Sequence, residues 1–456
     1  MTDPIRVLFP VGMLGGGFPP ETVARGIELG ADIIAVDGGS TDSGPYYLGK
    51  ATAKTARAAV ERDLRVLVPA AHDAGIPLVV GSCGTSGCDA GVDWVYDIVE
   101  EICTDLGISR KVTRIYAEQD PARLVDLLAQ DRIHPLGTAQ ELKPETLARC
   151  RHIVGLMGPG PFADALRDGA EIVLAGRSTD TALAAVLPLL HGLPAGPAWH
   201  AAKIAECGGL CTEHPRSGGV LLSIDDTGFT VEPLAVDARC TTRSVAAHML
   251  YENADPFRLR EPAGTLDASG AVYTALDERR VRVEGSIFEP AAQQTIKLEG
   301  AASVGFQSQL ITGIRDPEIL GRIDEWCGRL IAYLDKHVPL TFGLTPDEYH
   351  FSLRRFGHDA VLGEAEPERG TAPREVGIVL TVTARDQATA GDLAKFANPL
   401  MLHLPIEDDN PFPSFAFISS PAETTRGEAF EFVLQHAVDV ADERDLFRPV
   451  QTVVGQ

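Results

Sequence analysis

Short apolar runs, each followed by a turn of glycine and polar residues and then by a helical pattern, recur through the first 190 residues. The junctions at 31–42, 77–87 and 172–180 share this order. Apolar runs of this length between turn signals are typical of buried strands. Their alternation with helices predicts an α/β fold with a mostly parallel sheet covered by helices.

The polar ends of these runs indicate where a ligand would bind. Parallel strands bring their carboxyl ends to one edge of a sheet, and open α/β sheets bind ligands at that edge. Two of the turns, Asp37-Gly-Gly-Ser-Thr-Asp42 and Gly176-Arg-Ser-Thr-Asp180, finish on the same Ser-Thr-Asp sequence. We therefore expect Asp37, Asp42, Ser82, Arg177 and Asp180 to converge on one cleft.

The residue types in these turns suit acid–base chemistry on an anion. Asp37 stands where an apolar strand ends, and Glu206 adjoins Cys207 and two glycines, so Asp37, Asp42 and Glu206 are the predicted catalytic residues. Arg177 offers a planar fork for a carboxylate beside a helix whose N-cap is expected at Ser178, Thr179 or Asp180. The predicted substrate-binding residues are Gly38, Ser40, Thr41, Tyr46, Ser82, Arg177, Ser178, Asp180, Arg239 and Arg243.

Each of these features also has a purely structural interpretation. Serine, threonine and aspartate cap turns and helices in most proteins, and arginines such as Arg239 and Arg243 often form surface ion pairs. The glycine-rich loop 12–17 matches neither a dinucleotide fingerprint nor a phosphate loop. Its four glycines nevertheless favour close approach of the backbone to a ligand.

Metal binding is expected to be optional. Asp37, Asp42 and Asp180 could supply hard oxygen ligands for Mg²⁺, although no cofactor is required by the sequence. Cys207 and Cys211, with His214 and Cys240, lack the second half of a zinc ligand pattern. We expect the eight cysteines to be mostly reduced thiols.

Charge and hydropathy exclude several classes of partner. The formal net charge of −24 would repel nucleic acid and anionic membrane surfaces. The sequence has no apolar stretch of the roughly 20 residues needed for a membrane span, and no signal-peptide pattern at its start. These observations predict a cytoplasmic protein that binds a small anionic substrate.

The pattern of expected helices and strands changes along the chain and predicts three domains. Residues 1–215 form the α/β domain with the candidate active-site loops. Residues 216–362, with short β-like runs between turns, form an α+β region packed on the first domain. Residues 363–456 alternate strands and helices in a small layer that fits a ferredoxin-like C-terminal domain.

The chain resembles the acyclic terpene utilisation family of AtuA-like proteins. The segments that carry the resemblance are Asp37-Gly-Gly-Ser-Thr-Asp-Ser-Gly-Pro45, Gly176-Arg-Ser-Thr-Asp-Thr-Ala182, Glu206-Cys-Gly-Gly209, Leu298-Glu-Gly-Ala301, Phe415-Ala-Phe417, Ser420-Pro421 and Phe432-Val-Leu-Gln-His436. The resemblance implies a role in catabolism of branched terpenoid or other organic acids, and a ferredoxin-like C-terminal domain. The scarcity of aromatic and methionine residues gives no sign of a terpenyl pocket.

Together these observations predict a lyase of the hydratase type, acting on a small carboxylate or acyl-CoA. An isomerase or acyl-transfer enzyme using the same cleft is the first alternative. A noncatalytic binding subunit of a multi-subunit enzyme is the second. We expect a homo-oligomer in each case.

Overall fold

A computed structural model describes residues 3–214 and 218–455. The chain forms two compact units, unit 1 from Met1–Ala302 with Phe432–Gln456, and unit 2 from Ser303–Glu431. The chain enters unit 2 within strand β15 (Gln294–Ile314) and leaves it within strand β19 (Glu423–Val440). The expected division at 1–215, 216–362 and 363–456 stays a prediction, and its first boundary adjoins residues 215–217, outside the described residues.

Unit 1 is built on a ten-stranded sheet whose centre is parallel. The central strands, in spatial order, are β1 (Ile5–Phe9), β2 (Ile33–Asp37), β3 (Leu78–Gly81), β7 (Ile172–Ala175) and β4 (Arg110–Tyr116). Each pairs in parallel with its neighbour. Successive residues contribute to the cores on opposite faces of the sheet, which explains why β2, β3 and β7 are apolar over nearly their whole length.

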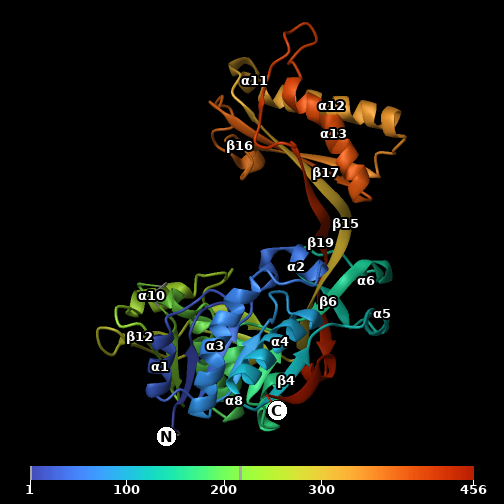
Figure 1. The fold of residues 1–456 in the computed structure, drawn as a ribbon. Coiled ribbons are helices and arrows are strands. Elements are labelled where there is room, and N and C mark those ends of the chain that lie inside the picture. The colour runs from blue at the N-terminus through green and yellow to red at the C-terminus, as the bar shows by residue number, and fades with distance from the viewer. Residues whose placement is uncertain (1–2, 215–217, 456) are drawn as a thin grey trace. The chain divides into compact units, whose positions relative to one another are not determined.

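Helices cover both faces of this sheet (Figure 1). Helices α1 (Pro20–Glu28), α3 (Arg57–Ala74) and α4 (Asp89–Leu106) pack on one face, and α7 (Gly160–Arg167), α8 (Ala182–Leu190) and α9 (Ala195–Ala205) pack on the other. The sequence therefore predicted the helix-covered parallel centre.

The expectation of a mostly parallel sheet is wrong for the sheet as a whole. On one side β8 (Val220–Ile224), β9 (Gly228–Pro233), β13 (Val281–Glu284) and β12 (Val272–Ala275) continue from β1 in antiparallel pairing. On the other side β20 (Arg448–Val454) runs antiparallel to β4. Connections such as 225–227, between β8 and β9, are too short for the crossover that parallel pairing needs.

The other elements of unit 1 surround this sheet. The apolar run at 151–157 forms β6 (Cys150–Gly155), which pairs antiparallel with β15 outside the ten-stranded sheet. The remaining elements are α2 (Pro45–Gly49), α5 (Pro121–Ala129), β5 (Ile133–Pro135), α6 (Pro144–Arg149), α10 (Thr242–His248), β10 (Arg258–Glu261), β11 (Gly264–Asp267) and β14 (Ile287–Pro290), with short 3₁₀ turns at Thr41–Ser43, Gly208–Cys211 and Glu443–Leu446.

Unit 2 packs helices against antiparallel strands. Strand β17 (Val376–Ala384) lies between β16 (Tyr349–Phe356) and β15. Alternate residues of β17 are buried, and their core includes residues of α12 (Ile323–Phe342) and α13 (Gln387–His403). The other elements are α11 (Pro317–Gly321), a 3₁₀ turn at Gly363–Ala365 and β18 (Ala416–Phe417). No helix in the described part of either unit has the length and apolar character needed to cross a bilayer.

Candidate active site

Three loops meet at the carboxyl edge of the parallel strands. Asp37 is the register partner of Gly81, and the Gly38 N–H donates to the Gly81 carbonyl at 2.7 Å. The Ser82 N–H donates to the Gly176 carbonyl at 3.0 Å. A Cβ atom at Gly38 would lie 2.7 Å from the carbonyl oxygens of Gly81 and Ser82, so this close approach requires glycine. Ser82 itself has a left-handed φ of 42°.

Asp37 is held in this edge as a buried carboxyl group with an unused oxygen. Its Oδ2 accepts a hydrogen bond from the Gly39 N–H at 2.9 Å. Its Oδ1 is buried and has no hydrogen-bond partner among the described residues. Burial, reinforced by the negative charge of Asp180, holds the pKa of Asp37 well above its ordinary value. The folded environment therefore favours the protonated form of Asp37 more than water does.

Arg177 is committed to a carboxylate of the chain itself. Its Nε lies 3.1 Å from Oε2 of Glu299, and both side chains are buried. The Thr41 hydroxyl donates to the same Glu299 oxygen at 2.8 Å, and Lys297 Nζ lies 2.7 Å from Oε1. Burial acts to raise the pKa of Glu299, but Arg177 and Lys297 outweigh it and bring that pKa to about 2. Glu299 thus occupies part of the fork that we expected to bind substrate.

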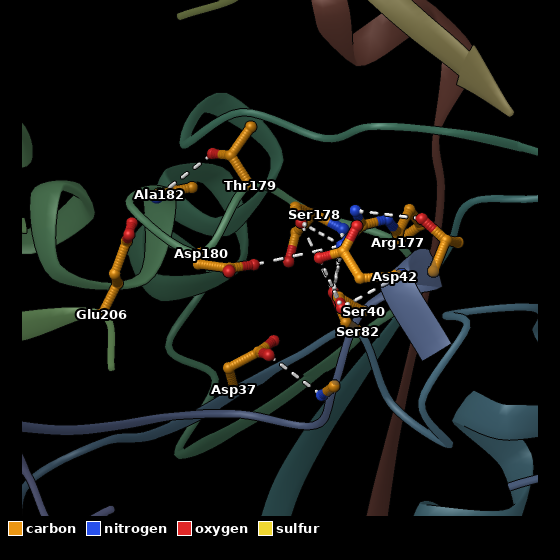
Figure 2. Close-up of polar contacts among 12 residues, drawn as sticks. Asp37, Ser40, Asp42, Ser82, Arg177, Ser178, Thr179, Asp180, Ala182 and Glu206 are labelled. Carbon is orange, nitrogen blue, oxygen red and sulfur yellow. Dashed lines mark hydrogen bonds and ion pairs between the residues drawn. The ribbon is translucent and has the colours of Figure 1, made fainter. Parts of the chain in front are cut away.

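A cavity of about 510 Å³ opens beside these loops. Its wall carries both acidic and basic side chains from the 177–181 loop, the end of α9 and the segment 252–261. The charged lining residues are Arg177, Asp180, Lys203, Glu206, Glu252, Asp255, Arg258, Arg260 and Glu261. The loops that carry Asp37, Asp180 and Glu206 are drawn in Figure 2.

Three carboxyl groups on this wall have a raised pKa. Burial raises the pKa of Glu206 to about 8, against the opposing charge of Lys203, with which it forms a close ion pair. Burial likewise raises the pKa of Glu261 to about 7, although Glu261 accepts a hydrogen bond from the Thr181 hydroxyl at 3.0 Å. The pKa of Asp180 is raised by burial despite the nearby Arg177. The cavity therefore has groups that can exchange protons near neutral pH.

The predicted helix N-cap lies further along the chain. Helix α8 begins at Ala182, with Thr181 at the N-cap position. Residues 177–179 cannot begin the helix because their backbone is bridged to Met157: the Met157 N–H donates to the Arg177 carbonyl, and the Thr179 N–H donates to the Met157 carbonyl, each at 2.9 Å. The Ser178 hydroxyl oxygen is buried without a hydrogen-bond partner in the described part of the chain.

Other predicted catalytic and substrate-binding residues do not line the cavity. Arg239 is exposed and pairs with Glu213, and Arg243 is exposed on α10. Asp42 is exposed and accepts a hydrogen bond from the Ser40 hydroxyl at 2.9 Å. Tyr46 is 43% exposed and lies edge-on to Tyr47. None of these residues lines the cavity, which has Lys203, Arg258 and Arg260 as its additional cations.

The glycine-rich loop 12–17 serves contacts within the protein. The N–H groups of Gly15 and Gly17 donate to the buried Asp63 carboxylate at 2.8 and 3.1 Å. A Cβ at Gly12 would lie 2.8 Å from the backbone of Cys207. These close contacts within the protein explain the glycines, and no ligand is needed to explain them.

Potential metal ligands cluster at one place in the described residues. Glu206, Cys207 and His248 form the single group of three or more His, Cys, Asp or Glu side chains there whose ligand atoms all lie within 4.8 Å of one another. The three aspartates considered for Mg²⁺ do not meet this distance. Cys211 instead hydrogen-bonds Cys240, and all eight cysteines are free thiols.

Sequence reasoning missed several functional candidates. Glu299 stands in the Leu298-Glu-Gly-Ala301 segment, which could have been examined for a partner of Arg177. The sequence around Glu261 and Arg260 gives no sign of a functional site, because only the fold brings segment 252–261 close to the end of α9. His248 is an isolated histidine at the end of a short helix, a pattern that indicates no ligand by itself.

These features define an α/β protein with a polar cavity, lined by carboxyl groups of raised pKa, beside the carboxyl edge of its parallel strands. The family model of acyclic terpene utilisation family protein AtuA matches residues 49–407. The chain therefore belongs to this family. Comparisons with curated proteins and with solved structures give no match.

Proposed function

We propose that this protein is a catabolic hydro-lyase that adds water to, or removes it from, a small carboxylate or acyl-CoA. The observation that carries the proposal is the pair of carboxyl groups, Glu206 and Glu261, with pKa values of about 8 and about 7 on one cavity wall. Both groups can be present in either protonation state at neutral pH, as an acid and a base acting together require.

The reaction assigns a role to each side of the cavity. In dehydration, a carboxylate takes the proton from the carbon next to the acyl group, and a carboxylic acid protonates the departing hydroxyl to form water; hydration reverses both transfers. Glu206, Glu261 and Asp180 line this cavity, while Asp37, with its unpartnered oxygen, does not line it but is close enough to Asp180 to feel its charge. Asp37 and Asp42 stay predicted catalytic residues. Arg260 supplies positive charge for the substrate anion, whereas Arg258 on the same wall is paired with Asp267 and Glu289, each at 2.6 Å.

An isomerase that only moves a proton is the second candidate, because the same pair of carboxyl groups supports it. Acyl transfer has less support, since burial and the charge of Glu206 raise the pKa of the Cys207 thiol, which disfavours the nucleophilic thiolate. A noncatalytic binding subunit is the third candidate.

Isotope incorporation distinguishes these candidates. The full-length protein is incubated with a panel of 2-enoic and 3-hydroxy carboxylates and their CoA thioesters, in ²H₂O and separately in ¹⁸O-water. A hydro-lyase places ¹⁸O in the hydroxyl group and deuterium on the adjacent carbon. An isomerase incorporates deuterium alone. Thermal stabilisation by the same compounds without either isotope indicates a binding subunit and contradicts the proposal.

Substitutions locate the reaction in the cavity. We expect Glu261→Gln and Glu206→Gln each to lower kcat by about 10²- to 10⁴-fold, the range for loss of a general acid or base. Glu213→Gln, which changes an exposed carboxylate outside the cavity, is the matched control and should retain activity. Equal activity in all three variants would contradict the assignment.

We further propose that unit 2 is a ferredoxin-like module. Its support is the chain order β15, α12, β16, β17, α13, β19 and the strand order β16, β17, β15, β19. Unit 2 begins at Ser303, and the domain boundary at 363 stays a prediction. Assembly as a homo-oligomer and a cytoplasmic location stay predictions. Light scattering and cell fractionation test them.

A further inference from the structure

The end of α9 and the end of α10 bring a carboxylate, a thiol and an imidazole together. Glu206 follows α9 directly, Cys207 begins the turn before Gly208–Cys211, and His248 is the last residue of α10. One ligand atom from each lies within 4.8 Å of the other two. Ligand atoms around a tetrahedral zinc ion are separated by roughly 3.5 Å, as follows from bond lengths of about 2.0–2.3 Å. Small side-chain rotations would therefore close the group on an ion.

His248 gives a second, independent indication of a ligand. Its side chain is 5% exposed, and its Nε2 is buried with no hydrogen-bond partner among the described residues. The imidazole also hydrogen-bonds the backbone of Lys203. Metal-binding histidines commonly donate one ring N–H to a carbonyl oxygen, which orients the other nitrogen toward the ion. An imidazole that lies beside a thiol and a carboxylate and has one unpartnered ring nitrogen fits that arrangement.

We propose that Glu206, Cys207 and His248 bind a divalent transition-metal ion, with Zn²⁺ as the expected ion. Thiolate and imidazole ligands select zinc over Mg²⁺ or Ca²⁺, which prefer oxygen. Three protein ligands leave one coordination position open, as in zinc sites that bind water or substrate. Glu206 and Lys203 line the 510 Å³ cavity, which gives the ion a route of entry.

Lys203 is a nearby cation that opposes this site. It forms an ion pair with Oε1 of Glu206. A carboxylate has two oxygens, so one can accept from the ammonium group while the other binds the ion. Binding also converts the Cys207 thiol to a thiolate, releasing a proton, so Glu206 and Cys207 together bring two negative charges to the ion.

The inference goes beyond the proposed reaction and alters one role in it. With the ion bound, Glu206 is a ligand, and Glu261 and Asp180 are the cavity carboxyl groups that remain free to move protons. The site is detected by metal binding alone. A hydratase that binds no ion would overturn only this inference, and a zinc protein without hydratase activity would overturn only the proposed function.

Cobalt titration tests the site directly. The full-length protein, first dialysed against a chelator, is titrated with Co²⁺ and followed by absorption spectroscopy. We expect a thiolate-to-cobalt charge-transfer band that saturates at one ion per chain and disappears when Zn²⁺ is added. Failure to bind either ion, or cobalt binding without the band, would overturn the proposal.

Two variants test the thiol and imidazole ligands, and a third is the control. Cys207→Ser should abolish the band, and His248→Ala should weaken cobalt binding by about 100-fold or more, since loss of an outer-shell partner alone costs about 10–100-fold. Cys327→Ser, in unit 2, is the matched control and should bind as the unaltered protein does. Far-ultraviolet circular dichroism checks folding. If His248→Ala does not fold, the near-isosteric Cys207→Ser decides alone, and a band that persists in it places the site elsewhere.

Discussion

The buried ion pair between Arg177 and Glu299 provides the sharpest test of how the 177–181 loop is held to strand β15. The substitution Glu299→Gln keeps the size of the side chain and a hydrogen-bond acceptor for the Thr41 hydroxyl. It removes the negative charge that faces Arg177 and Lys297. Arg177 then loses the nearer of two carboxylate partners and keeps Asp180, whose Oδ1 lies 4.0 Å from its Nη1.

The size of the effect follows from the pKa of Glu299. A fall from the ordinary value of 4.5 to about 2 is about 2.5 pKa units, which at 1.36 kcal/mol per unit is about 3.4 kcal/mol. Breaking a buried ion pair by removing one partner costs roughly 3–5 kcal/mol in other proteins. We therefore expect the free energy of unfolding of unit 1 to fall by about 3 kcal/mol at pH 7.

The dependence on pH has a definite sign. The folded-state pKa of Glu299 is lower than the unfolded one, so its stabilisation is complete above about pH 4.5 and is lost as pH falls toward 2. The difference between the unaltered protein and Glu299→Gln should be constant from pH 7 to about pH 5 and shrink below it.

Hydrogen exchange measured by mass spectrometry is the appropriate assay, because a chain with two units need not unfold in one step. Peptides covering 172–175 in β7 report on unit 1. The control is Glu101→Gln, which removes a carboxylate from the exposed pair with Arg57 and should cost less than about 1 kcal/mol. A Glu299→Gln effect no larger than that of the control, or one independent of pH between 6 and 3, would refute the reasoning.

Two further predictions concern unit 1. Gly38→Ala should lower the free energy of unfolding by about 1–3 kcal/mol, because its Cβ would lie 2.7 Å from two carbonyl oxygens. Urea unfolding measures this change. An unchanged midpoint would show that the backbone at the carboxyl edge of the sheet can relax. Asp225→Asn should lower the melting temperature at pH 7 but hardly at pH 2. Burial opposes the ionisation of Asp225, yet Arg282 and Thr227 bring its pKa to about 2. The stabilisation is therefore present above about pH 3.8 and lost below it. An equal fall in melting temperature at both pH values would contradict this sign.

Local pattern in the sequence was sufficient for the parallel centre of unit 1. Strands β2, β3 and β7 are short apolar runs because both of their faces are covered, and each ends in turn residues that are recognisable without a structure. The meeting of Asp37, Ser82 and Arg177 at one edge follows from the same reasoning, since parallel neighbours must place their carboxyl ends together. Membership of the family was likewise readable from the motifs, and the family model bears it out.

The tertiary structure alone decided which partners the side chains at this edge of the sheet have. Arg177 meets Glu299 from 122 residues further along the chain, so a side chain that looks suited to a substrate carboxylate is taken up by the protein. The antiparallel flanks, the 252–261 wall of the cavity and the approach of His248 to Cys207 also depend on contacts between distant segments. Periodicity and turn residues record only neighbouring positions, and the pKa of a buried carboxyl group depends on charges that folding brings near it.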